Sequence, residues 1–333
     1  MEKTTGVKIL GVGRYVPELV ATNDDYAKIV ETSDEWITQR TGIKKRHISD
    51  GEPTYYLGAM SAKEAIENAG IAAEDIGLIL VTTCTPDYFT PSTACLIQRE
   101  LGVVGCPAID LNCACSGFVY AVDMARRYLL CDDIKYVLVV AAEELSKFVD
   151  YSDRSTCILF GDAAAAVVLE KSEDTLFSSF LAADGSGAGY LASRAMLTIN
   201  PFRQTDSEFD MQMPESNKHY LLQDGKEVYK FATKAMPYAV EKACEAAGIE
   251  PDDLDAIIPH QANIRIIETA AKHLHVPIDK MVLNIADYGN TSSASIPNAF
   301  YDGIESGRIK HGDKVCFVGF GGGLTYGACI VEY

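Results

Sequence analysis

The two halves of this chain carry the same landmarks in the same order, and this internal repeat limits the fold more than any other feature of the sequence. The segment Asn68–Ile71 has its counterpart in Ala246–Ile249, at a spacing of 178 residues. At the same spacing, the apolar run Val137–Val140 is matched by Val315–Val318. A repeat of this length indicates a duplicated structural unit whose two copies pack against each other.

Each copy alternates strand-like and helix-like segments, which is typical of an α/β fold. The apolar runs Ile76–Thr82 and Tyr136–Ala142 predict buried strands, and Thr54–Ala69 has the pattern of a helix. The chain has 333 residues, of which 48% are hydrophobic, and this is enough for two units of about 150 residues each. We therefore expect an α/β protein in two halves, residues 1–172 and 173–333.

Charge and composition exclude several classes of function. The net charge of −18 leaves no excess of basic groups to neutralise phosphates, so we expect no nucleic-acid partner. The apolar runs are far shorter than the ~20 residues of a membrane helix, and the first residues contain no targeting segment. We therefore expect a cytoplasmic protein without a membrane association. The ten cysteines are scattered, and Cys113 and Cys115 have no second pair to complete a zinc site, so we expect no metal.

Cys115 lies where an apolar strand meets the start of a helix. Ala108–Leu111 supplies the strand, and from Gly117 onward apolar residues recur at helical spacing. Free backbone N–H groups and the positive end of the helix dipole are expected to push the thiol toward the thiolate. The same N–H groups are able to hold an oxyanion. On position alone, a buried structural cysteine is the alternative.

The second half also places polar residues at the ends of strand-like runs. His260 follows one apolar run, Gly321–Gly323 follows another, and Asn290 precedes Ser293, which is the counterpart of Cys115 in the repeat. Each has a structural alternative, namely a satisfied core histidine, a tight turn and a helix cap. Because the two copies pack together, we expect these groups to meet at the junction where the helices start.

Two segments have clear local signals. Thr32 and Glu35 have the spacing of a capping box, which predicts that Thr32 begins the helix that contains Trp36. Residues 181–225 are rich in glycine and polar side chains and have no clear period. We expect a long irregular segment there that lies close to a functional site.

Together these motifs resemble β-ketoacyl-acyl-carrier-protein synthase III, the thiolase-superfamily condensing enzyme that starts type II fatty acid synthesis. The motifs that carry the resemblance are Gly11–Glu18, Arg40–Ile43, Cys115–Phe118, Phe160–Asp162, Pro259–Asn263, Gly289–Ser292 and Gly321–Gly323. The resemblance implies a thiolase-like duplicated αβαβα five-layer fold and a homodimer.

The resemblance also implies a catalytic set of Cys115, His260 and Asn290. Cys115 would take the acyl group from an acyl-CoA, while the backbone N–H groups of Cys115 and Gly322 hold the oxyanion. Malonyl-acyl carrier protein would then lose CO₂, and neutral His260 and Asn290 would donate hydrogen bonds to the enolate. The product would be a 3-oxoacyl-acyl carrier protein. Coenzyme A thioesters enter as substrates, and no cofactor is expected.

Further roles follow from the same resemblance. The residues implied in coenzyme A binding are Thr32, Trp36, Arg40, Arg154, Gly225 and Asn263. The residues implied in carrier-protein binding are Lys230, Arg265 and Lys272. Such a basic patch is what an acidic partner requires on a chain of net charge −18. Thr90 stands where some members carry a phenylalanine that closes the acyl pocket, so we expect room for primers longer than acetyl.

Two alternatives stay open. One is a related enzyme of specialised, polyketide-type metabolism that uses a longer or different primer, or malonyl-CoA as extender. The other is a non-catalytic partner subunit, which the presence of Cys115, His260 and Asn290 disfavours. Within the superfamily, Asn290 argues against the elongating synthases, which carry a second histidine there. Cys84 stands where hydroxymethylglutaryl-CoA synthases carry a glutamate base.

Overall fold

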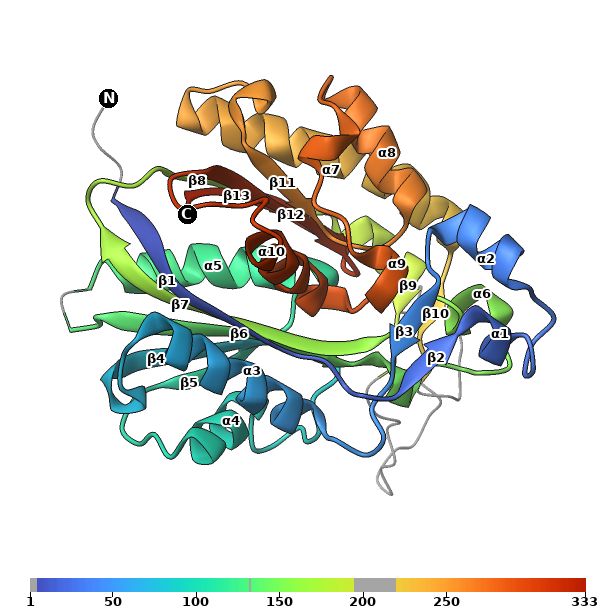
Figure 1. The fold of residues 1–333 in the computed structure, drawn as a ribbon, viewed down its shortest axis with the longest axis horizontal. Coiled ribbons are helices and arrows are strands. Elements are labelled where there is room, and N and C mark those ends of the chain that lie inside the picture. Colours follow the sequence, from blue (N-terminus) through green and yellow to red (C-terminus); the bar gives the residue numbers. More distant parts are fainter. Residues whose placement is uncertain (1–4, 132, 195–219) are drawn as a thin grey trace, which may run out of the picture.

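Two β-sheets alternate with three layers of helices in the computed structural model of this chain (Figure 1). The structure describes residues 5–131, 133–194 and 220–333. In spatial order, the first sheet contains β1 (Gly6–Tyr15), β7 (Asp162–Ser172), β6 (Tyr136–Glu144), β4 (Ile76–Thr82) and β5 (Ala108–Leu111). The second sheet contains β11 (Ala256–Pro259), β12 (Lys314–Gly321), β13 (Thr325–Glu332) and β8 (Phe177–Ala183).

The second sheet repeats the order of the first. β8, β13, β12 and β11 occupy the places that β1, β7, β6 and β4 occupy in the first sheet. Each sheet contains a parallel pair of strands, β4 with β6 in the first sheet and β11 with β12 in the second. The two sheets differ at the position of β5. The equivalent segment, 178 residues further on, is the short helix α9 (Ile285–Tyr288). The duplication predicted from the sequence is therefore present, with one strand lost from the second copy.

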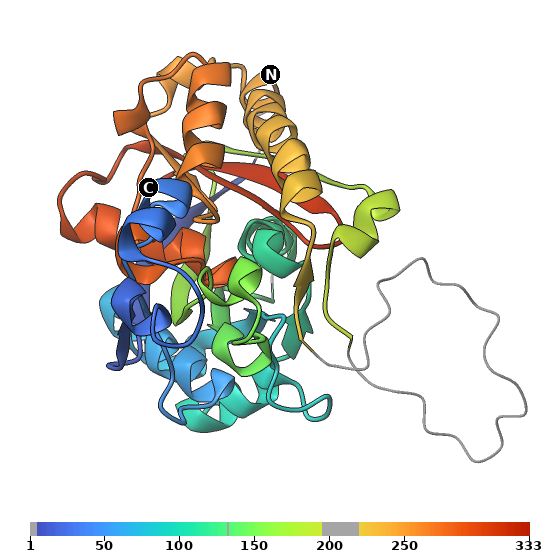
Figure 2. The same ribbon diagram turned by 90° about the vertical axis from the view of Figure 1, so that its right-hand side faces the viewer.

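Helices cover both sheets and fill the space between them. α3 (Thr54–Ala69) and α4 (Thr93–Leu101) cover the outer face of the first sheet, and α7 (Gly225–Ala247) and α8 (Ile264–His273) cover that of the second. α5 (Gly117–Tyr128) and α10 (Ser295–Glu305) lie between the sheets. Figure 2 shows the same stacking from the side. The expected five-layer thiolase-like fold is confirmed.

Strand β4 is apolar along almost its whole length, because it is covered on both faces. Leu78 and Leu80 belong to the core between the two sheets, which also contains Phe118 of α5. Ile79 and Val81 point to the opposite side and belong to the core under α3. A strand whose two faces are both covered has no polar position to alternate with, so its continuous apolar run predicted its bounds.

The remaining elements lie together on the right-hand side of Figure 1. They are β2 (Val20–Thr22), α1 (Asn23–Tyr26), α2 (Asp34–Thr41), β3 (Lys45–His47), α6 (Arg154–Cys157), β9 (Leu191–Ala192) and β10 (Leu222–Gln223). α2 is capped by Ser33, whose hydroxyl accepts a hydrogen bond from Trp36 N at 3.1 Å. The prediction that Thr32 is this cap is therefore wrong by one residue.

The segment predicted to be irregular is partly regular. Its described residues include the end of β8, a 3₁₀ turn at Gly185–Tyr190, and the paired strands β9 and β10. The rest of the segment, residues 195–219, lies outside the described residues. In the part of the chain that the structure describes, no helix has both the length and the apolar composition needed to cross a bilayer.

Candidate active site

A cavity of about 790 Å³ lies where the two halves meet. The residues predicted to be catalytic all line it, although they come from three separate places in the fold. Cys115 precedes α5, His260 follows β11, and Asn290 follows α9. Gly322, whose N–H is predicted to help hold the oxyanion, lines the same cavity directly after β12. The fold thus brings the four residues together.

Cys115 belongs to a 3₁₀ turn, Ala114–Ser116, that leads directly into α5. The turn is tight enough that Ala114 adopts a left-handed backbone conformation, with φ of 46°. Gly321 packs against this turn, and a Cβ at position 321 would lie 2.5 Å from Cys115 N. The backbone at the end of β12 is therefore in direct contact with the backbone of Cys115.

The Cys115 thiol is 7% exposed, and its burial raises its pKa to about 12. A hydrogen bond with Ser292 lowers the pKa, and the negative charge of Glu143 raises it, but both effects are smaller than that of burial. Burial therefore acts against the thiolate that the start of the helix is expected to favour.

His260 is fully buried and neutral. Burial lowers its pKa to about 3, although the ring donates a hydrogen bond to the backbone carbonyl of Ser292. Its Nδ1 lies 2.7 Å from Ser295 Oγ, and its ring packs edge-to-face on Phe320 at 5.2 Å between centroids. Contacts at both nitrogens therefore hold the ring in its neutral form. Its role as a hydrogen-bond donor to an enolate stays a prediction of the resemblance.

Asn290 is 6% exposed, and its backbone is fixed by the loop that precedes β7. Its N–H donates to Leu159 O at 2.9 Å, and its carbonyl accepts from Gly161 N at 3.1 Å. The side-chain Oδ1 accepts from Ser292 N at 2.9 Å. Because the oxygen of the amide is used in this way, the Nδ2 donor is the end that remains for a ligand.

The mouth of the cavity contains four of the six residues predicted to bind coenzyme A, namely Trp36, Arg40, Gly225 and Asn263. Asn263 also caps α8 and donates to Arg40 O at 3.0 Å, so it joins the two sides of the mouth. Thr32 does not line the cavity, and among the residues that the structure describes its buried hydroxyl has no hydrogen-bond partner.

Arg154 lies over Trp36, with 4.9 Å between the guanidinium carbon and the ring centroid, and donates to Glu31 O at 2.8 Å. This is a direct cation–π contact. The two side chains therefore touch, so the adenine of a coenzyme A would fit between them only after Arg154 moves.

The residues predicted to bind a carrier protein lie on α7 and α8. Lys230 and Arg265 line the cavity mouth, whereas Lys272 is exposed at the end of α8, away from the cavity. Lys230 pairs with Glu227 at 2.5 Å, and Arg265 donates to Gln39 O at 2.8 Å. The helices α7 and α8 contact each other, and of the three cations only Lys230 and Arg265 lie at the cavity.

Thr90, the predicted gate of the acyl pocket, is exposed and does not line the cavity of its own chain. The two residues before it, Tyr88 and Phe89, are 57% and 69% exposed. A gating role for Thr90 therefore requires that this loop reach the cavity of a second chain.

Sequence reasoning missed Ser292 and Glu143. Ser292 adopts a left-handed backbone conformation, with φ of 50°. Its carbonyl contacts His260, and its hydroxyl contacts Cys115. It stands 178 residues after Ala114, so the repeat contained the signal. Glu143 is a fully buried carboxylate at the end of β6. In the sequence, the signal for Glu143 was an acidic residue directly after the apolar run Tyr136–Ala142.

Two family models match the chain. The model described as 3-Oxoacyl-[acyl-carrier-protein (ACP)] synthase III matches residues 109–192, and the model of the C terminal part of the same family matches residues 244–333. The chain is also 45% identical over 328 residues to a beta-ketoacyl-[acyl-carrier-protein] synthase III of Clostridium novyi. This match covers 98% of the present chain and 99% of the Clostridium protein.

Solved structures are similar over the full length. A 3-oxoacyl-[acyl-carrier-protein] synthase III from Aquifex aeolicus has a TM-score of 0.89 and 42% identity, covering 98% of this chain and all of that one. The priming β-ketosynthase of the R1128 polyketide pathway has a TM-score of 0.87 and 32% identity, covering 99% and 97%. Fold and site thus define an acyl-transferring condensing enzyme of the thiolase fold. The chain belongs to the β-ketoacyl-[acyl-carrier-protein] synthase III family.

Proposed function

We propose that this chain condenses an acyl-CoA primer with malonyl-acyl carrier protein, releases CO₂ and forms a 3-oxoacyl-acyl carrier protein, the step that initiates type II fatty acid synthesis. One observation carries the proposal. Cys115, His260 and Asn290 come from both halves of the fold and line a single cavity. A nucleophile beside two neutral hydrogen-bond donors is the set that acyl transfer followed by decarboxylation requires.

In the first half-reaction, Cys115 Sγ attacks the thioester carbonyl of the acyl-CoA, and the C–S bond to coenzyme A breaks. The negative charge that develops on the carbonyl oxygen is held by the backbone N–H groups of Cys115 and Gly322. In other enzymes, one such donor is worth about 10²–10³ in rate. The close packing of Gly321 on Cys115 N supports this role, because it keeps the two donors side by side.

In the second half-reaction, the malonyl thioester loses CO₂ and forms an enolate, which attacks the acyl-Cys115 carbonyl. No base is needed to remove a proton from carbon, because the electron pair comes from the C–C bond that breaks. His260 and Asn290 Nδ2 donate hydrogen bonds to the enolate oxygen. The low pKa of His260 supports this assignment, since an imidazolium would protonate the enolate rather than stabilise it.

We further propose that the active form is a cytoplasmic homodimer and that the enzyme needs no resident cofactor. Two aromatic side chains, Tyr88 and Phe89, are exposed on the loop that carries Thr90. Exposed neighbouring aromatics are typical of a surface that another protein covers. A second copy of the chain would cover them, and Thr90 would then reach the partner cavity as its gate and admit primers longer than acetyl.

Intact-mass spectrometry tests the proposed function. The protein is incubated with acyl-CoA donors from acetyl to decanoyl, one at a time, and then with malonyl-acyl carrier protein. The expected result is a mass gain on Cys115 that disappears when the 3-oxoacyl product forms. Absence of an adduct with every acyl-CoA donor would contradict the choice of primer. A product formed with malonyl-CoA but not with the malonyl carrier protein would favour the polyketide-type alternative.

A further inference from the structure

A fully buried arginine lies beside the segment that holds Asn290. Arg46, on β3, has no exposed surface. One guanidinium nitrogen donates to Asn23 Oδ1 at 2.7 Å, and another donates to the backbone carbonyl of Ile158. The guanidinium also lies over the ring of Tyr26, 4.4 Å from its centroid. Among the described residues no carboxylate pairs with it. A buried charge without a counter-ion is expensive, so its contacts indicate what it is kept for.

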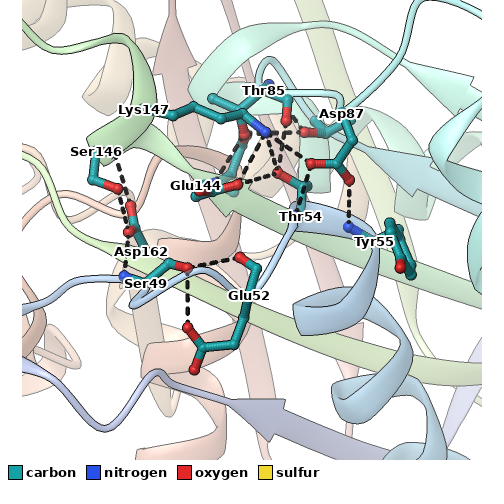
Figure 3. A network of polar contacts seen from close by, with 12 residues as sticks. Ser49, Glu52, Thr54, Tyr55, Thr85, Asp87, Glu144, Ser146, Lys147 and Asp162 are labelled. Atoms are coloured by element: carbon teal, nitrogen blue, oxygen red, sulfur yellow. Dashed lines mark hydrogen bonds and ion pairs between the residues drawn. The ribbon is translucent and has the colours of Figure 1, made fainter.

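The segment that Arg46 holds is anchored at both ends. This segment, Ile158–Asp162, is called the bridging segment below, and Arg46 binds the carbonyl at its start. At its end, the buried carboxylate of Asp162 accepts a hydrogen bond from Ser49 N at 2.8 Å. The same carboxylate accepts from the N–H and the hydroxyl of Ser146, at 2.9 and 2.6 Å (Figure 3). The nearby acid is therefore used to fix the bridging segment rather than to neutralise Arg46.

Asn290 takes its backbone position from the bridging segment. Its N–H donates to Leu159 O at 2.9 Å, and its carbonyl accepts from Gly161 N at 3.1 Å. These bonds make Phe160 and Asn290 an isolated pair of parallel bridge residues. The bridge joins the two halves of the chain, because the bridging segment belongs to the first half and Asn290 to the second. The bridging segment thus sets the point from which the Asn290 amide reaches the cavity.

Arg46 contacts both sides of this bridge. A Cβ at Gly161 would lie 2.8 Å from Arg46 Cβ, and a Cβ at Gly289 would lie 3.4 Å from the same atom. Gly289 directly precedes Asn290 and has a φ of 65°. A Cβ at Gly289 would also lie 2.9 Å from Leu159 O, the acceptor of the Asn290 N–H. The stem of Arg46 therefore packs against the bridge on both sides, while its guanidinium holds the bridging segment from one end.

We propose that Arg46 is a positioning residue for the decarboxylation step, which holds the bridging segment in place and thereby fixes the Asn290 amide where the enolate forms. This inference rests on the proposed function. Arg46 does not line the cavity, so it acts through Asn290. A guanidinium suits this task because its donors lie in a rigid planar fork, which binds Asn23 and the Ile158 carbonyl at the same time.

The turn that contains the nucleophile has a support of its own. The Ser116 hydroxyl of that turn lies 2.8 Å from both Cys113 O and Thr325 Oγ1, and Gly321 packs against Cys115 N. Among the described residues, no hydrogen bond joins this turn to Arg46 or to the bridging segment. Loss of the Arg46 contacts is therefore expected to impair decarboxylation and to leave acyl transfer intact.

Two matched variants test the proposal. Arg46→Met keeps an unbranched side chain but removes every donor. Arg126→Met is the control, because Arg126 makes the same two kinds of contact at another place. It donates to the backbone carbonyl of Thr5 at 2.9 Å and lies over the ring of Phe177, 5.4 Å from its centroid. Arg126 does not line the cavity. Circular dichroism establishes that each variant is folded.

Hydrogen exchange, followed by mass spectrometry on short peptides, tests the positioning without any substrate. In Arg46→Met, the amides of Gly161 and Asn290 should exchange about tenfold faster than in the wild type, since a hydrogen bond to a charged group is lost. The amides of α5 should keep their wild-type exchange, and Arg126→Met should leave all of these amides unchanged. Unchanged exchange at Gly161 and Asn290 in Arg46→Met overturns the proposal, and so does an equal increase in α5.

The two half-reactions test the consequence for the chemistry. Mass gain on Cys115 reports acyl transfer, and CO₂ release from malonyl-acyl carrier protein reports decarboxylation. Arg46→Met should acylate at the wild-type rate but release CO₂ about 10²-fold more slowly, because a small misplacement of a positioned group has this order of effect. Equal loss of both half-reactions, or loss of neither, overturns the proposal. Failure of the proposed function is a different result, namely a wild type that takes no acyl group although Arg46→Met still shows the local change in exchange.

Arg46→Lys keeps the test decisive if Arg46→Met does not fold. It retains the positive charge, but a single ammonium group does not reproduce the planar fork. CO₂ release should therefore fall about tenfold while acyl transfer stays at the wild-type rate. If the charge alone were responsible, Arg46→Lys would release CO₂ as fast as the wild type, and this result would overturn the proposal.

Discussion

Gly321 lies against the backbone nitrogen of Cys115, so closely that a Cβ at position 321 would be 2.5 Å from it and 3.1 Å from Ala114 Cβ. The two residues come from opposite halves of the chain. Their contact joins the end of β12 to the turn that presents the nucleophile. A glycine is required there because the neighbouring atoms belong to the backbone and have little freedom to move away.

Substitution Gly321→Ala should therefore separate the two backbone donors of the oxyanion site. We expect the rate of Cys115 acylation to fall by about 10²-fold, since loss of one oxyanion donor has this order of effect. The measurement is the rate of mass gain with an acyl-CoA. Gly185→Ala is the matched control, because a Cβ at position 185 meets no atom within 4 Å. A Gly321→Ala variant that acylates as fast as this control would contradict the assigned role.

Asn290→Ala should separate the two half-reactions. Among the described contacts, Asn290 makes no hydrogen bond to the Cys115 turn, so acylation of Cys115 should continue. Its amide is the proposed donor to the enolate, so decarboxylation of the malonyl thioester should fall by about 10²-fold. Mass gain on Cys115 and release of CO₂ report the two steps. Cys115→Ala serves as the comparison, since it should abolish acyl transfer but still bind coenzyme A. Equal loss of both steps in Asn290→Ala would argue against this division.

The buried state of His260 predicts a pH dependence of stability. Its pKa falls from 6.5 to about 3 on folding, so below pH 6.5 the unfolded chain binds a proton that the folded chain does not. The free energy of unfolding should therefore decrease as pH falls through this range, by up to about 1.4 kcal/mol per pH unit for this group. Denaturant titrations at several pH values measure the slope. His260→Gln should have a smaller slope, and an identical slope would contradict the prediction.

Trp36 is the only tryptophan of the chain, and its fluorescence should report coenzyme A binding. Because Arg154 occupies one face of the ring in the unliganded state, binding of an adenine there should change the emission. Arg154→Ala removes a contact with Trp36 worth about 0.5–1 kcal/mol that an adenine would have to displace, so the dissociation constant should fall by a few-fold. A fluorescence titration with coenzyme A measures both effects. An emission that coenzyme A leaves unchanged would place the adenine elsewhere.

Lys272→Glu should weaken use of the carrier protein without affecting small substrates. Lys272 is exposed and lies outside the cavity, so its charge can act on a large acidic partner but not on bound coenzyme A. We expect the KM for malonyl-acyl carrier protein to rise several-fold at low salt and the difference to shrink at high salt. Lys242→Glu, an equal charge change on α7, is the control. Equal effects of the two variants would contradict a specific patch.

Local signals predicted much of the fold. The bounds of β4 and α3 are as the sequence predicts, because each depends on a run of neighbouring residues. The position of Cys115 beside His260 and Asn290 came from the family resemblance rather than from spacing.

Features that depend on distant packing were not predictable in the same way. The helix α9 stands at the repeat position of β5, although the neighbouring strand β11 is present and forms only an isolated bridge there, between Ile257 and Met281. The raised pKa of the Cys115 thiol depends on burial that arises only in the folded chain. Likewise, the complete burial of Glu143 is visible only once the strand ends are brought together.

The paired left-handed turns at Ala114 and Ser292 have an evolutionary consequence. Two identical copies of one ancestral unit would have carried the same residue at both turns and could not have assigned them different tasks. In a single chain that contains both copies, each turn carries its own residues. The first turn presents the nucleophile Cys115, and the second supplies the Ser292 hydroxyl that contacts it, so the same bend of the backbone has a different chemical use in each half.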